Sequence, residues 1–297
     1  MNDKGIAFSR FHPIPLFCYF ISVMLFAVFT QNPIIIALAF LGGALFNLIT
    51  GSAREILSDI KFYTAAFLLL SLTNPLFSHN GATPLFFMND NPVTLEAILC
   101  GINTAAMITG VMLVCKTFSK VMESDKILLL IGKISPKLST VISMSLRFIP
   151  LLKKKWAEIR DAQTALGYFR GDGITDKLVS YAKIFSALVT WALENAVDTS
   201  ASMNARGYEL RGKKQFSLFR FRKSDAFFLV FTLAMSAAVL VGYITGSADF
   251  AFYPIVTEIN TDAPALVSYT AFAALSLFPS FFEIKEALKW RYLRSKI

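Results

Sequence analysis

The stretch AILCGINTAAMITGVMLVC, residues Ala97–Cys115, runs for nineteen residues without a charged side chain. A helix needs roughly 17–25 apolar residues to cross the hydrocarbon core of a bilayer. Five further stretches of similar length are free or nearly free of charge: Ile14–Thr30, Pro33–Thr50, Phe62–Phe77, Ala226–Ile244 and Ala263–Phe282. We therefore expect an all-α integral membrane protein with about six transmembrane helices.

The composition of the whole chain agrees with this expectation. Of the 297 residues, 55% are hydrophobic and only 16% are charged, which is too apolar for a soluble domain. The first apolar stretch lacks a small-residue cleavage site, so we expect it to be a retained span rather than a signal peptide. No pair of acidic residues and no pair of histidines lies within the six stretches.

The positive charge of the chain is concentrated in its middle. Of 29 Lys and Arg residues, 4 precede residue 116, 20 lie between Lys116 and Lys223, and 5 follow Phe282. The segments Ser78–Glu96 and Thr245–Asp262 contain none. Because cytoplasmic loops of membrane proteins are enriched in Lys and Arg, these two segments should face outward and both termini should be cytoplasmic. Membrane orientation accounts for the net charge of +9, and we expect no binding of nucleic acid.

This distribution divides the chain into three parts. Residues 1–115 should contain the first four spans, residues 116–224 a cytoplasmic region, and residues 225–297 the last two spans with a basic C-terminal tail. Within the cytoplasmic region, Ser135 and Pro136 suit the cap and the first position of a helix. That helix should reach Gly167, with a kink at Pro150.

A second long helix is predicted from Ile174 to Arg206, a run of 33 residues without Gly or Pro. At 1.5 Å per residue it would be about 50 Å long. Its apolar centre, Ile184–Leu193, is too short to span a bilayer. An apolar stripe is predicted on this helix, made up of Leu178, Phe185, Leu188, Ala192 and Ala196. Two interpretations stay open: a buried helix of a bundle, or an amphipathic helix at the membrane boundary.

The two long helices end in similar residues. The first ends in Ala165-Leu166-Gly167-Tyr168 and the second in Ala205-Arg206-Gly207-Tyr208. Glycine suits the left-handed residue that follows a helix. Two similar helix ends suggest two similar docking sites, as a pair of related subunits would offer.

Several kinds of chemistry are not expected. The run Gly207–Lys214 resembles a phosphate-binding loop, but Lys214 stands where that loop needs a Ser or Thr hydroxyl, and a helix precedes it instead of a strand. Cys18, Cys100 and Cys115 have no metal-ligand spacing and suit packing. We expect no metal site, no cofactor, no nucleotide site and no catalytic residues in this polypeptide.

Three stretches carry a resemblance to a known family: NPLFSHNGATPLFFMNDNPVTLEAI, SMSLRFIPLLKKKWAEIRDAQTALG and VTWALENAVDTSASMNARGYELRG. Together, from roughly Phe62 to Gly212, they resemble the transmembrane T component of energy-coupling factor transporters, which are bacterial importers of vitamins and transition-metal ions. The resemblance implies an all-helical scaffold in the bacterial plasma membrane. Two cytoplasmic coupling helices would dock on two ABC-type ATPases, and a separate small membrane protein, the S component, would bind the substrate.

The resemblance also implies roles for particular residues. Ala205, Arg206 and Gly207 match the family's docking motif, and Ala165, Leu166 and Gly167 match it except that Leu166 replaces the usual arginine, with Arg160 or Arg170 as nearby charges. Arg147 also matches a family stretch, and with Pro150 we interpret it as structural, bonded to helix carbonyls or to an acidic group. The S component is expected to contact Leu188, Ala192 and Ala196.

Two other functions remain as alternatives. A permease of a conventional ATP-driven transporter would contain the translocation path itself and would dock through one short loop. A membrane enzyme would need an intramembrane constellation of catalytic residues. The paired long helices with two similar ends favour the scaffold over both.

Overall fold

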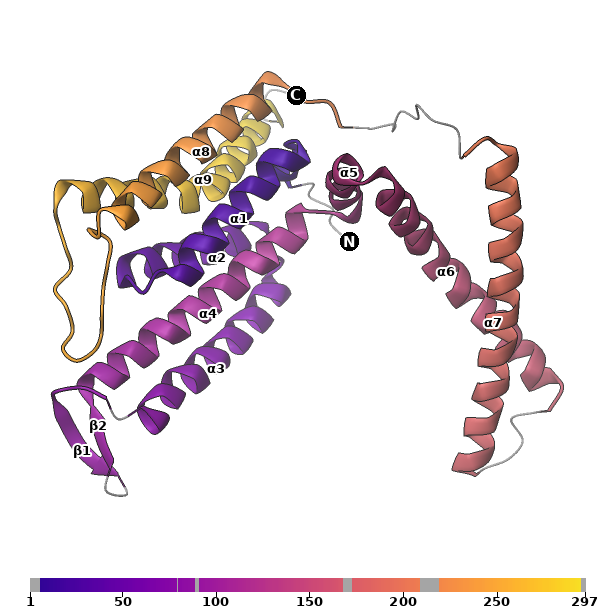
Figure 1. Cartoon of the computed structure of the whole chain (residues 1–297), viewed down its shortest axis with the longest axis horizontal. Coiled ribbons are helices and arrows are strands. Elements are labelled where there is room, and N and C mark those ends of the chain that lie inside the picture. Colours follow the sequence, from indigo (N-terminus) through magenta and orange to yellow (C-terminus); the bar gives the residue numbers. More distant parts are fainter. Residues whose placement is uncertain (1–5, 79, 89–90, 168–172, 209–218, 295–297) are drawn as a thin grey trace. The chain divides into compact units, whose positions relative to one another are not determined.

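The computed structural model describes residues 6–78, 80–88, 91–167, 173–208 and 219–294. Within these ranges the chain is almost entirely helical, as expected, and divides into two compact units (Figure 1). One unit comprises residues 1–126 and 219–297, and the other comprises residues 127–218. The first contains the 3-10 turn η1 (Ala7–Arg10), α1 (Pro13–Phe29), α2 (Pro33–Thr50), α3 (Ala53–Phe77), β1 (Pro84–Met88), β2 (Asn91–Thr94), α4 (Leu95–Val121), α8 (Lys223–Ile244) and α9 (Ala263–Arg294).

The helices of the first unit begin at polar caps that the sequence supplies. Proline occupies the first position of both α1 and α2. His12 Nδ1 accepts a hydrogen bond from the Ile14 amide, and Asn32 Oδ1 accepts one from the Ile34 amide. Thr94 Oγ1 accepts from the Ala97 amide at the start of α4. These side chains satisfy amides that have no partner within a helix, and so fix where each helix starts.

Five of the six apolar stretches lie within one helix each, and the first, Ile14–Thr30, runs one residue past the end of α1 at Phe29. Five helices, α2, α3, α4, α8 and α9, are long and apolar enough to cross a membrane, and α1 is a shorter apolar helix of 17 residues. The expected all-α membrane fold is confirmed. The predicted boundaries were too narrow, because α3 begins at Ala53 instead of Phe62 and α4 continues from Cys115 to Val121.

Small residues allow the membrane helices to approach closely. A methyl group on Gly42 of α2 would lie 2.6 Å from the Ser276 carbonyl oxygen of α9, and one on Gly242 of α8 would lie 2.6 Å from the Ser268 side chain of α9. In lipid, helices associate largely through such close packing. The glycines therefore hold α9 between α2 and α8 (Figure 1).

An N-terminal segment is built into the core of this unit. Phe8 is fully buried and its ring lies 5.6–6.4 Å from seven aromatic rings. These rings belong to Phe11, Tyr19, Phe20, Phe46, Phe228, Phe278 and Phe282. The two carboxylate oxygens of Glu283 accept from the amides of Ala7 and Phe8 at 3.2 and 3.1 Å. The segment thus joins α1, α2, α8 and α9.

Two further charged side chains secure this segment. Asp225, buried at the start of α8, accepts from the His12 amide at 3.0 Å and from the Arg222 amide at 2.8 Å. Lys126 is buried and its Nζ donates to the carbonyl oxygens of Ser9 and Val121. Burial lowers the pKa of Lys126 because it penalises the charged form. The two carbonyl acceptors partly offset that cost.

A short antiparallel hairpin, β1–β2, interrupts the otherwise helical fold, and the sequence-based expectation did not include it. Phe87 pairs with Pro92, and Met88 pairs with Asn91. The Asn-Asp-Asn run at 89–91 between apolar residues is a turn signal that could have indicated it. Glu96, next to the hairpin, accepts from Thr83 Oγ1 at 2.9 Å.

The second unit consists mainly of two long helices, α6 (Pro136–Ala165) and α7 (Ile174–Ala205). It is preceded by α5 (Ser124–Ile134), and the division between the units falls within α5, after Lys126. Trp156 of α6 stacks on Tyr181 of α7 with ring centroids 6.4 Å apart. Residues near the start of α6 meet residues near the end of α7, so the two helices are antiparallel (Figure 1).

Candidate functional site: the ends of α6 and α7

The two long helices end in the same local geometry. Gly167 and Gly207, which follow them, have φ values of +83° and +73°. The Gly167 amide donates to the Thr164 carbonyl at 3.0 Å, and the Gly207 amide donates to the Asn204 carbonyl at 2.9 Å. Glycine takes this left-handed conformation without the steric cost that other residues incur. The similarity of the two sequences therefore extends to their backbones.

Each end presents one large side chain to the surroundings. Leu166 is 75% exposed at the end of α6, and Arg206 is exposed at the end of α7. Ala165 and Ala205 beside them are exposed as well. A cation at a helix C-terminus interacts favourably with the helix dipole, and a guanidinium can bind a carboxylate through two hydrogen bonds. One end thus offers apolar surface and the other offers a charged donor.

Arg160 and Arg170 are the two cationic residues nearest the end of α6 in the sequence. Arg160 is exposed, and its guanidinium lies 3.5 Å from the carboxylate of Asp161. Arg170 lies outside the described residues.

A cleft of about 510 Å³ lies between the early part of α6 and the late part of α7. Eight residues line it: Ser143, Met144, Arg147, Asp198, Thr199, Ser202, Met203 and Arg206. Arg147 is exposed there, and neither a hydrogen bond nor an ion pair joins it to another described residue. The structure thus brings Arg147 and Arg206 to one cleft. Pro150 lies inside α6, which continues through it.

The apolar stripe of α7 is only partly accessible. Ala196 is exposed, while Leu188 and Ala192 are half-buried. Leu178 and Phe185 of the stripe, and Leu193 and Val197 beside it, are 61–69% exposed. In α7 only Ser180 and Ile184 are buried, so within the described residues α7 is not the buried helix of a bundle. Its surface can accept an apolar partner.

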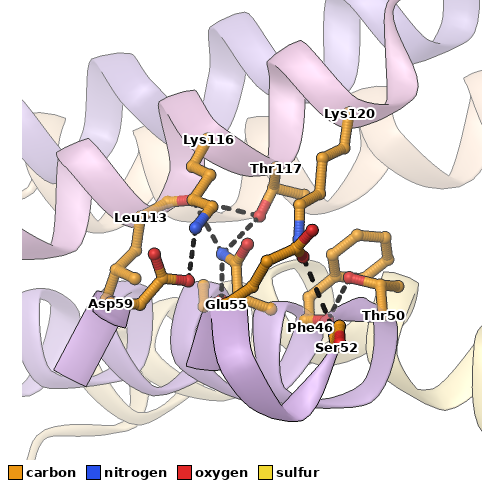
Figure 2. A network of polar contacts seen from close by, with 11 residues as sticks. Phe46, Thr50, Ser52, Glu55, Asp59, Leu113, Lys116, Thr117 and Lys120 are labelled. Carbon is orange, nitrogen blue, oxygen red and sulfur yellow. Dashed lines mark hydrogen bonds and ion pairs between the residues drawn. The ribbon is translucent and has the colours of Figure 1, made fainter. Parts of the chain in front are cut away.

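The first unit contains a polar cluster that the sequence-based expectation missed, because α3 and α4 extend beyond their apolar stretches (Figure 2). Asp59 of α3 forms an ion pair with Lys116 of α4, and one turn away Glu55 lies 3.9 Å from Lys120. The sequence did contain a signal for this cluster. Two acidic residues four positions apart on one helix can pair with two lysines four positions apart on another helix.

Asn47 of α2 belongs to the same cluster and contacts α4. Its Nδ2 donates to the carbonyl oxygens of Gly43 and Leu113 and to Thr117 Oγ1, at 2.9, 3.1 and 3.1 Å. Asn47 is 5% exposed, so these bonds give its buried amide nitrogen partners, while its Oδ1 accepts no hydrogen bond from the described residues. Together with the ion pairs, they hold α2 and α3 to α4 at the end of the helices where α3 begins. No residue of α3 is buried, so these contacts matter for its attachment.

Comparison with known proteins agrees with this architecture. The family CbiQ, described as cobalt transport protein, matches residues 13–218. The energy-coupling factor transporter transmembrane protein EcfT of Lactobacillus helveticus is 29% identical over 107 residues, which cover 35% of this chain and 39% of that protein. EcfT of Listeria innocua is 29% identical over 181 residues, which cover 54% of this chain and 66% of that protein.

The chain thus aligns with less than two thirds of the length of each of these relatives. The family match is broader, since it covers well over half of the chain and includes α1–α7. It takes in both helix ends described above. This multi-pass membrane protein belongs to the CbiQ cobalt transport family.

Proposed function

We propose that this protein is the T component of an energy-coupling factor importer, a membrane scaffold that couples ATP hydrolysis by two ABC-type ATPases to substrate release by a membrane S component. The observation that carries the proposal is the matched pair of helix ends, each closed by a glycine of positive φ and each presenting one exposed side chain. The name of the two EcfT relatives supports the same assignment.

In this role α6 and α7 are the coupling helices. The end of α7 offers Arg206 to a carboxylate on one ATPase, and the end of α6 offers Leu166 to an apolar groove on the other. The flanking residues Ala165, Gly167, Ala205 and Gly207 have little or no side chain, which lets the partner backbone approach. The chain itself catalyses no reaction and binds no cofactor.

The S component rests on the apolar surface of α7 that includes Leu188, Ala192 and Ala196. Side chains of 61–69% exposure beside them enlarge this surface. An apolar face that a small membrane protein covers loses contact with water, which favours association. Substrate recognition belongs to that partner, and this chain transmits the movement of the ATPases to it.

Orientation follows from the distribution of Lys and Arg. Residues 116–224, with 20 of the 29 cationic residues, form the cytoplasmic region, between spans 1–4 in residues 1–115 and spans 5 and 6 in residues 225–297. Both termini are cytoplasmic. The segments without Lys or Arg, including β1–β2, face outward.

Copurification tests the proposal directly. The tagged protein, expressed with its native partners and extracted in mild detergent, is expected to retain two ATPase subunits and one small membrane protein that binds substrate without this chain. A double variant with Leu166→Ala and Arg206→Ala should lose the ATPases while its own stability is unchanged, because both side chains are exposed. A complex with no ATPase in the unmodified protein would contradict the assignment.

A further inference from the structure

The cleft between α6 and α7 combines residues from two helices that are far apart in sequence. Ser143 and Arg147 are one turn apart on α6, and Asp198, Ser202 and Arg206 follow each other at one-turn intervals on α7. Residues four positions apart lie on the same face of a helix. The cleft is therefore the place where a charged face of α6 meets a charged face of α7.

The charges in this cleft are not balanced. It contains two arginines and one carboxylate, and among the described residues no carboxylate lies within 4.0 Å of either guanidinium. Other cations on the same helices behave differently, since Lys155 of α6 lies 3.0 Å from Glu158. Two like charges that face one cleft favour the entry of an anion.

The remaining lining residues indicate what kind of anion fits. Met144 and Met203 are half-buried and give the cleft an adaptable apolar wall. Ser143, Thr199 and Ser202 add hydroxyls. An acidic side chain with its methylene stem matches this combination, because its carboxylate meets the guanidinium groups while its stem contacts the methionines.

We propose that Arg147 and Arg206 together bind one acidic side chain of an ATPase subunit, and that Asp198 opposes this binding. The inference rests on the proposed function and deepens it: the docking site at the end of α7 includes a residue of α6. Asp198 lines the same cleft and carries the same sign as the incoming carboxylate. It weakens docking by repulsion and makes the contact easier to release.

The test measures the dissociation constant between the ATPase pair and this protein, held in nanodiscs of zwitterionic lipid with its S component. We expect at least tenfold weaker binding for Arg147→Ala and for Arg206→Ala, because either change removes one of two cations from a shared anion. Their combination should weaken binding by less than the product of the single effects, since the first loss already disrupts the shared contact. Asp198→Asn should strengthen binding several-fold.

Controls separate a specific contact from a general loss of positive charge or of folding. Lys154→Ala removes an exposed cation of α6 that does not line the cleft, and it should bind the ATPases nearly as the unmodified protein does. Arg147→Lys keeps the charge and should recover part of the affinity that Arg147→Ala loses. The unfolding temperature of each variant should equal that of the unmodified protein, because both arginines are exposed.

The possible outcomes distinguish failure of the two-arginine site from failure of the proposed function. If Arg147→Ala binds like Lys154→Ala while Arg206→Ala binds weakly, the two-arginine site is wrong and the proposed function stands. If Asp198→Asn weakens binding, the carboxylate supports the site instead of opposing the partner, which also overturns the inference. An Arg147→Ala effect that needs anionic lipid in the nanodisc would assign the cleft to a lipid headgroup. If the unmodified protein binds no ATPase at all, the proposed function itself fails.

Discussion

Leu166 allows the clearest test of how the first helix end docks. Full burial of a leucine side chain stabilises by about 1.5–3 kcal/mol. Leu166 is 75% exposed in the chain alone, so docking can bury about three quarters of that surface, worth about 1–2 kcal/mol. Leu166→Ala is therefore expected to weaken ATPase binding by about fivefold to thirtyfold, at 1.4 kcal/mol per factor of ten.

The salt dependence of binding distinguishes this end from the other. The loss caused by Leu166→Ala should be the same at low and high ionic strength, because removing apolar contact leaves the charges in place. Arg206→Ala should instead flatten the salt dependence, since screening acts on the contact that this change removes. Binding is measured by titrating the ATPase pair onto the purified protein over a range of salt concentrations, and substrate transport is measured in proteoliposomes.

Two results would refute this reasoning. Unchanged affinity for Leu166→Ala at every salt concentration would mean that the end of α6 makes no apolar contact in the complex. A change in the salt dependence as large as that of Arg206→Ala would mean that Leu166 acts by positioning a charge. Leu166→Met, which keeps most of the volume, is the matched control and should bind nearly normally.

Three further predictions follow from exposure and burial. Ala196→Glu places a charge on the exposed apolar surface of α7 and should release the S component while both ATPases stay bound; retention of the S component would assign its contact elsewhere. Phe8→Ala should lower the free energy of unfolding by about 3–5 kcal/mol, seen as a lower thermal midpoint in detergent, and a midpoint above that of Phe8→Leu would contradict the packing described. In a variant without native cysteines, a cysteine at Asp249 should react with an impermeant reagent in intact cells and one at Lys154 only after lysis; the reverse pattern would overturn the orientation.

Local signals in the sequence predicted the long helices of the second unit closely. The expected start at Pro136 and the expected left-handed glycines at 167 and 207 all occur in the structure. The second helix was predicted to run to Arg206, and it ends at Ala205. Caps, prolines and glycines act on their immediate neighbours, so these features are readable from a short stretch of sequence.

The contacts that the sequence did not reveal depend on how helices rotate against each other. The predicted spans were limited to Phe62–Phe77 and Ala97–Cys115 because charged residues lie just outside them. In the structure α3 and α4 both continue past these limits, and Asp59 pairs with Lys116 there. Likewise, no local pattern places Arg147 of α6 beside the cleft that Arg206 also lines. Both arrangements follow from packing between segments that are about fifty to sixty residues apart.

The burial of Phe8 has a consequence for how the protein is made. Ala7 and Phe8 leave the ribosome long before Glu283, the residue that accepts their amide hydrogen bonds 276 and 275 positions later. Until α9 is inserted, the two backbone amides lack the Glu283 carboxylate, and the Phe8 ring lacks its contacts with Phe278 and Phe282. Completion of the N-terminal core therefore requires that α9 be in place.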